Sequence, residues 1–132
     1  MLARREHARF ELRQKLEQRG FSLEDIDPVL DDLCEQSLLS DDRFAEVYSH
    51  HRTEAGFGPV RIRAELRQRG VGGDIIDNVV SAGDDEWLGV LRRVWTKRFG
   101  ETVPEEFRER MKQMRYLQYR GFTNDQIRTL FD

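Results

Sequence analysis

Arginine side chains are the best candidates for chemistry in this sequence, and their densest group falls within one short predicted helix. Arg61, Arg63, Arg67 and Arg69 occur there against a single acid, Glu65. A guanidinium group presents a planar set of donors that pairs bidentately with carboxylates or phosphates. Arg63 and Arg67 share one helical face because they are four residues apart, whereas Arg61 and Arg69 lie elsewhere on the cylinder. The group predicts a broad basic band that contacts an acidic partner; the alternative is a solvated helix face.

A second candidate surface combines arginine with tyrosine near the C-terminal end of the sequence. Tyr116 and Tyr119 stand beside Arg115 and Arg120, a mixture typical of partner contacts. Packing within the protein remains the favoured interpretation for both tyrosines, and partner contact is the alternative. We also expect Trp87 and Trp95 to pack in the core, since they are eight apart on one helical face.

Catalytic and metal-binding patterns are not found in the sequence. His50 and His51 are adjacent, so on a helix they point about 100° apart. No cluster of cysteines or carboxylates completes a zinc site around them. The sequence also contains no glycine-rich phosphate loop and no nucleophile–base motif. We therefore expect no enzymatic activity, no metal and no cofactor, and we expect Cys34 to be a small core residue.

Composition and charge favour a helical protein that binds another protein. The 132 residues are 38% hydrophobic and 36% charged, which suits an elongated fold with much solvated surface. The net charge of −3 disfavours tight non-specific DNA binding, whereas basic segments beside the strongly acidic segment 22–42 suit a charge-patterned protein partner. The alternative is a helical protein that binds nucleic acid directly, with residues 59–70 as the recognition helix. One cysteine and no membrane-length apolar stretch indicate a cytoplasmic protein without a membrane contact.

An internal repeat organises the chain. The segments Leu16–Phe21, Leu66–Val71 and Leu117–Phe122 align, with glycines at 20, 70 and 121. Spacings of 50 and 51 residues predict tandem three-helix modules, and each glycine is expected to end a helix in a left-handed conformation. We predict three repeats, at residues 1–56, 57–101 and 102–132, the last incomplete with two helices. The predicted helices span 3–19, 22–37, 41–55, 59–69, 73–82, 84–99, 104–119 and 123–131.

Capping residues mark several of these helix starts. Ser22 with Asp25, and Thr123 with Gln126, resemble capping boxes. Pro28 conflicts with a helix that begins at Ser22, so that helix either kinks or starts late. Pro104 suits a first helical position. The buried stripe predicted for helix 41–55 comprises Phe44, Val47, Tyr48 and His51.

The longest motif in the chain resembles the signature of the RecX family. It runs from Asp41-Asp42-Arg43-Phe44-Ala45 through Tyr48, Arg52 and Gly56-Phe57-Gly58-Pro59 into Arg61–Val71. The opening Ala3-Arg4-Arg5-Glu6-His7 also resembles the family. Along the motif, Phe44 and Tyr48 are predicted to fill a joint between modules, and Gly56 and Gly58 to let the chain turn. Pro59 is predicted to begin a helix on which Ile62 and Leu66 face inward, and Gly70 to end it.

The resemblance implies a fold and a function. RecX proteins are all-α, built of tandem three-helix repeats, and regulate RecA without enzymatic activity. The resemblance implies a slightly curved rod that lies in the helical groove of the RecA–single-stranded DNA filament, and we expect the chain to be a monomer. There it would block filament extension and inhibit ATP hydrolysis, strand exchange and co-protease activity. Weak direct contact with DNA would accompany this role in homologous recombination, DNA repair and the SOS response.

Overall fold

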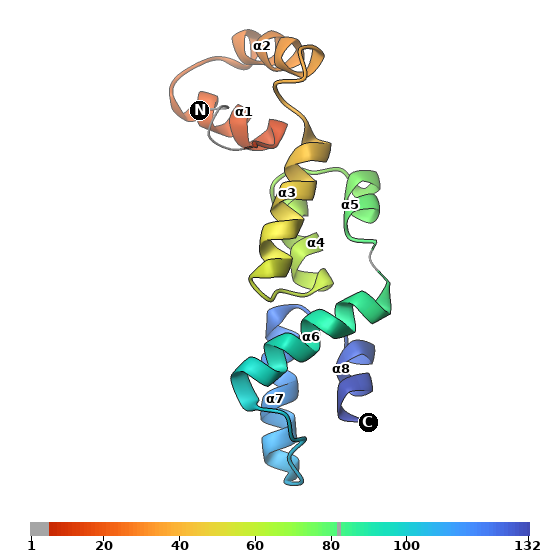
Figure 1. Ribbon diagram of the computed structural model, residues 1–132. Helices are drawn as coiled ribbons and strands as arrows, with labels where there is room; N and C mark the ends of the chain where they lie inside the picture. The colour runs from red at the N-terminus through yellow and green to blue at the C-terminus, as the bar shows by residue number, and fades with distance from the viewer. Residues whose placement is uncertain (1–5, 82) are drawn as a thin grey trace. The chain divides into compact units, whose positions relative to one another are not determined.

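The computed structural model describes residues 6–81 and 83–132, and this part of the chain contains eight α-helices and no strand (Figure 1). The prediction of an all-α fold is confirmed. The helices, in chain order, are α1 (Arg9–Gln18), α2 (Leu23–Glu35), α3 (Asp41–Glu54), α4 (Pro59–Gln68), α5 (Gly73–Val79), α6 (Asp84–Phe99), α7 (Phe107–Arg120) and α8 (Asn124–Phe131).

Two helices, α1 and α7, begin three or more residues later than predicted. The predicted helix 3–19 is wrong over residues 6–8, which precede α1, while residues 3–5 lie outside the described part. Side-chain oxygens bind the main-chain N–H groups at the start of α1 and so fix where the helix begins. The Arg9 N–H donates to Asp41 Oδ1 at 2.8 Å, and the Ala8 N–H donates to Glu11 Oε1 at 3.3 Å. Pro104 is not a first helical residue, since α7 begins at Phe107 after an extended N-cap residue.

The predicted caps have different outcomes. Thr123 forms a true capping box, because its Oγ1 accepts from the Gln126 N–H at 3.1 Å and its own N–H donates to Gln126 Oε1 at 3.0 Å. Ser22 does not, because its hydroxyl donates to the Asp25 carboxylate at 3.1 Å and makes no capping bond to the main chain. Helix α2 nevertheless begins at Leu23 with Pro28 inside it, so the late-start alternative is wrong.

Glycines end helices where the repeat predicted them. Gly20, Gly70 and Gly121 have φ values of +95°, +78° and +102°, in the left-handed region that favours glycine. Gly121 is the C-cap of α7. The aligned glycines therefore mark the same local structure three times along the chain.

The chain divides into two compact units. The first holds the described part of Met1–Ser49 together with Glu65–Val79, and the second holds His50–Ala64 with Val80–Asp132. Helices α3 and α4 contribute residues to both units. The core of the first unit includes a cluster of buried aliphatic side chains from α1, α2 and the segment before α3: Leu12, Ile26, Leu30 and Leu39.

Helix α3 buries a different stripe from the predicted one. Phe44 is buried and its ring stacks on Tyr48 with centroids 5.6 Å apart, but Val47 and His51 are exposed. The reason is rotation of the helix, which turns Ala45 and Ser49 inward in their place.

Cys34 is exposed, which corrects the expectation that it lies in the core. The buried positions of α2 are Ile26 and Leu30, and the face continues to Leu33, which packs partly buried against the same core. Cys34 is four residues after Leu30, but a helical turn takes 3.6 residues, so repeated steps of four rotate away from the buried face. Its Sγ instead accepts a hydrogen bond from Arg9 Nη1 at 3.7 Å. The hydrogen bond from Arg9 to the Asp31 carboxylate raises the pKa of Arg9.

The second unit packs around the indole rings of α6. Trp87 and Trp95 are both buried, as predicted. The Trp95 ring meets Phe131 edge-on at 6.2 Å, and its Nε1–H donates to Gln113 Oε1 at 2.8 Å. This hydrogen bond satisfies two polar groups inside the unit. On α4, Ile62 and Leu66 are fully buried, which confirms that both face inward.

Candidate functional site

The turn between α3 and α4 lies against the end of α7, within the second unit. The Gly58 N–H donates to the Arg120 carbonyl at 2.8 Å, and the Val60 N–H donates to the Gly121 carbonyl at 2.9 Å. Gly56 has a φ of +89°, so it turns the chain as predicted. Gly58 has another role, because a Cβ there would lie 2.5 Å from the Gly121 carbonyl carbon. The main chain at Gly58 therefore packs directly against the main chain at Gly121.

A cationic cluster surrounds Phe57 in this turn. The guanidinium carbons of Arg52, Arg120 and Arg61 lie 3.8, 3.9 and 4.5 Å from the Phe57 ring centroid. All three distances are within the range of a cation–π contact. Arg61 also lies 5.1 Å from the Tyr119 ring centroid and donates to the Tyr119 carbonyl at 3.2 Å. These contacts fix the guanidinium groups in position.

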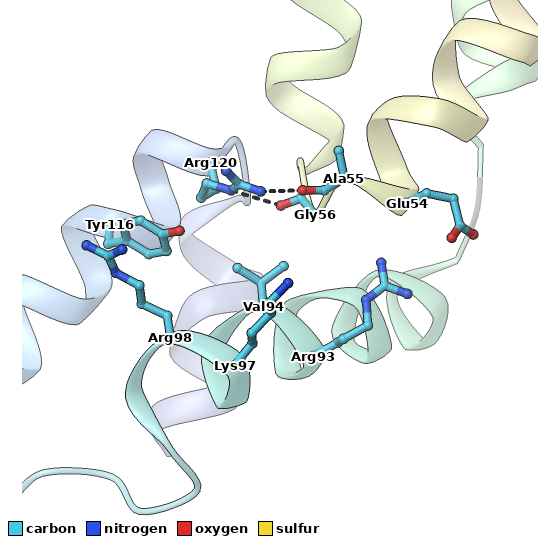
Figure 2. A pocket seen from close by; sticks show the side chains of 9 residues that line it. All are labelled: Glu54, Ala55, Gly56, Arg93, Val94, Lys97, Arg98, Tyr116 and Arg120. Carbon is cyan, nitrogen blue, oxygen red and sulfur yellow. Dashed lines mark hydrogen bonds between the residues drawn. The ribbon is translucent and has the colours of Figure 1, made fainter.

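A basic pocket of about 590 Å³ opens beside this turn (Figure 2). Helix α6 contributes three cationic side chains to it, and helix α7 and the end of α3 provide the rest. Its lining consists of Glu54, Ala55, Gly56, Arg93, Val94, Lys97, Arg98, Tyr116 and Arg120. Four cations thus face one carboxylate, and the pocket is suited to an anion.

Hydrogen bonds and ring contacts hold three of the four cations. Arg93 Nη2 donates to the Thr53 carbonyl at 3.0 Å. Arg120 donates through Nε to the Gly56 carbonyl at 3.1 Å and through Nη2 to the Ala55 carbonyl. The Arg98 guanidinium lies 4.8 Å from the centroid of Tyr116, whose ring meets Phe99 edge-on. The pocket is therefore preorganised by its own main chain and aromatic rings.

The exposed side of α7 carries a second group of cations. Arg108, Lys112, Arg115 and Tyr119 follow at helical spacings of four, three and four residues, and all four are exposed. Tyr119 is 71% exposed. We call these four residues the α7 stripe. It contains two of the residues predicted from the sequence, Arg115 and Tyr119, while Tyr116 and Arg120 line the basic pocket.

The four arginines of the predicted band do not share one environment. Arg63 donates to the Val80 carbonyl at 3.1 Å, and Arg61 lies in the Phe57 cluster. Arg69 lies 4.6 Å from the Tyr48 ring centroid and 3.9 Å from the Glu11 carboxylate. Arg67 is exposed. Three of these side chains have partners within the chain, and the partner-binding role of the group stays a prediction.

Sequence reasoning missed Arg93, Lys97 and Arg98, three of the cations of the basic pocket. A signal for them exists, because Arg93 and Lys97 are four residues apart and so share one face of α6. The apolar face of the same helix, with its two tryptophans, is the stronger pattern in the sequence.

The described part of the chain has neither a metal-binding cluster of side chains nor a membrane-spanning helix. No group of three or more His, Cys, Asp or Glu side chains there could hold a metal ion. His50 and His51 meet edge-on, with ring centroids 6.1 Å apart. None of the helices in residues 6–81 and 83–132 combines the length and hydropathy that crossing a bilayer requires.

The described part of the chain is thus an all-α protein with clustered cationic side chains. Three family models match the chain in sequence order. They describe the first three-helix domain of RecX, which matches residues 1–33, the second, which matches residues 40–80, and the third, which matches residues 84–131. Our repeat boundaries, at 56/57 and 101/102, differ from these matches and stay a prediction.

Known proteins resemble the chain over nearly its whole length. Regulatory protein RecX of Halorhodospira halophila is 51% identical over 97% of this chain and 80% of its own length. Regulatory protein RecX of Pseudomonas entomophila is 45% identical over 96% of this chain and 82% of its own. The crystal structure of RecX from Lactobacillus salivarius has a TM-score of 0.80, covering 98% of this chain and 86% of that one at 21% identity. The chain belongs to the RecX family of regulatory proteins.

Proposed function

We propose that this chain regulates RecA by binding the RecA–single-stranded DNA filament in its helical groove. Bound there, it limits filament extension, ATP hydrolysis and strand exchange. The observation that carries this proposal is membership of the RecX family across all three domains. The protein acts as a cytoplasmic monomer and needs no cofactor.

The α7 stripe supports a protein partner with an acidic surface. Exposed arginine and tyrosine side chains are enriched where proteins bind one another, and the α7 stripe has both. Its charge is positive although the chain as a whole carries −3. A local basic surface on an acidic protein favours a complementary protein over non-specific contact with DNA.

The test replaces the exposed residues of the α7 stripe that the sequence already singled out. The variant Arg115→Glu with Tyr119→Ala is added to RecA on single-stranded DNA, and ATP hydrolysis is measured against variant concentration. Leaving an interfacial charge without its partner costs about 2–5 kcal/mol, so the half-inhibitory concentration should rise more than about tenfold. Circular dichroism checks that helicity is kept.

Arg92→Glu is the matched control, because Arg92 is exposed on α6 and lies outside both the α7 stripe and the basic pocket. It should inhibit RecA like the unmodified protein. Equal inhibition by the stripe variant would show that the α7 stripe is only solvated surface. Failure of the unmodified protein to inhibit RecA at all would refute the proposed function.

Arg67 tests the contribution of the predicted band. It is a cleaner target than Arg63, whose hydrogen bond to the Val80 carbonyl would break on charge reversal. We expect Arg67→Glu to weaken inhibition of ATP hydrolysis, while Arg19→Glu, another exposed site, leaves it unchanged. Full inhibition by Arg67→Glu would remove this residue from the proposed interface.

A further inference from the structure

We propose that the basic pocket binds the phosphate group of a nucleotide, either free or within a nucleic-acid strand. The pocket belongs wholly to the second unit, between the end of α3, α6 and α7. This proposal is independent of the one for RecA, because it concerns a ligand that the chain binds by itself.

The charge of the basic pocket favours an anion. Its lining includes Arg93, Lys97, Arg98 and Arg120 but only one carboxylate, Glu54, an excess of three positive charges. Figure 2 shows the three cations of α6 on the side of that helix that faces Gly56 and Arg120. Cations held together repel one another, and a bound anion relieves that repulsion.

Hydrogen-bond donors remain available on the anchored guanidinium groups. Arginine has five N–H donors. Among the described residues, Arg120 uses its Nε donor for Gly56 and one Nη2 donor for Ala55, and Arg93 uses one for Thr53. The main-chain carbonyls thus fix the guanidinium planes and leave other donors for a ligand. Fixed planes lose little conformational entropy when they bind an oxyanion.

Phosphate fits the basic pocket better than a carboxylate does. A carboxylate has one charge and two oxygens, whereas a phosphate group offers more charge and more acceptor oxygens to match several cations. The volume of about 590 Å³ lies within the range of small-molecule sites, about 300–1,000 Å³, so its size does not exclude a nucleotide. Apolar lining side chains are few, Ala55 and Val94, which disfavours a mainly apolar ligand.

Gly56 gives the basic pocket its shape. A Cβ at Gly56 would lie 2.8 Å from Arg120 Nη2 and 2.8 Å from Val94 Cγ2. Any larger residue would therefore displace the arginine that anchors one wall. Gly56 is therefore needed both for the turn and, because it has no Cβ, for the position of the Arg120 side chain.

The experiment measures binding to the full chain without RecA. The probes are deoxythymidine monophosphate, a short oligo-dT strand and, as the acidic-peptide alternative, poly-glutamate. Titration calorimetry gives affinities, and amide NMR shifts at Gly56 and Val94 report where each probe binds. The variant Arg93→Gln with Lys97→Gln should lose about tenfold in affinity per removed phosphate contact. Its salt slope for oligo-dT should shrink by about 0.7 per contact.

Arg92→Gln is the matched control, because it removes one charge from an exposed site of α6 outside the lining. It should bind both phosphate probes like the unmodified chain. Binding of oligo-dT alone, with shifts at Gly56 and Val94, identifies a strand as the source of the phosphate. Binding of the monophosphate as well identifies a free nucleotide, and either result supports the proposal.

Three results would overturn the phosphate site. They are the absence of shifts at the pocket with both phosphate probes, equal losses in Arg92→Gln and the double variant, and tighter binding of poly-glutamate than of oligo-dT. None of them bears on inhibition of RecA, so the two proposals fail separately.

Discussion

Replacing Gln113 with methionine should lower the free energy of unfolding of the chain by about 1–3 kcal/mol. Gln113 is 4% exposed and Trp95 is 6% exposed, and the donor and acceptor atoms of their hydrogen bond are 2.8 Å apart. Methionine keeps nearly the volume of glutamine but cannot accept the indole N–H well. The cost is therefore that of a buried donor without a partner, with little added cavity.

Urea unfolding followed by far-ultraviolet circular dichroism measures this cost. With a typical slope of about 1–3 kcal/mol per molar urea, the midpoint should fall by about 1 M. Circular dichroism is preferred to tryptophan fluorescence because Trp95 itself is half of the hydrogen bond.

A double-mutant cycle tests the physical reason. Trp95→Phe alone leaves the Gln113 oxygen unsatisfied and removes part of a buried ring, so it should also destabilise. The double variant removes donor and acceptor together and should be more stable than the two separate losses imply, by about 1–2 kcal/mol. Strictly additive losses, or a Gln113→Met protein as stable as the original, would refute the buried hydrogen bond as the cause.

Three further changes have expected outcomes. Phe44→Ala should cost about 3–5 kcal/mol because the ring is 3% exposed, and an unchanged melting temperature would show that it is not packed. Gly58→Ala should cost about 1–3 kcal/mol by pressing a Cβ on the Gly121 carbonyl, and hydrogen exchange of the Val60 amide should accelerate; unchanged exchange would contradict the contact. Thr123→Ala should cost about 1 kcal/mol of thermal stability through loss of the capping hydroxyl, whereas Thr123→Ser should keep it; equal losses would exclude the cap.

Local features of the fold could be predicted from the sequence. Left-handed glycines at 20, 70 and 121 and the Thr123 cap depend on neighbours within a few residues, so the sequence contains their causes. Helix spacing likewise predicted the two buried tryptophans. Val47 and Cys34 were predicted to be buried but are exposed. The spacing of apolar residues defines the buried face of a helix only to within about one position, and packing against neighbouring helices decides which side chains point inward.

The candidate sites depended on contacts that sequence spacing does not reveal. Arg61 meets the carbonyl of Tyr119, and Arg120 meets that of Gly56, at separations of 58 and 64 residues. A helical wheel treats these arginines as solvated, whereas the fold gives them main-chain acceptors and an aromatic ring. The basic pocket was missed for the same reason, since its lining comes from three helices.

Gly58 and Gly121 form a pair in which neither residue can compensate for a change in the other. A Cβ at Gly58 would meet the main chain of Gly121, and a Cβ at Gly121 would meet Arg61. Glycine is already the smallest residue, so a substitution at one position has no second-site suppressor at the other. A genetic selection that begins from Gly58→Ala should return true revertants, or changes in the side chains that pack α7, but never a replacement of Gly121.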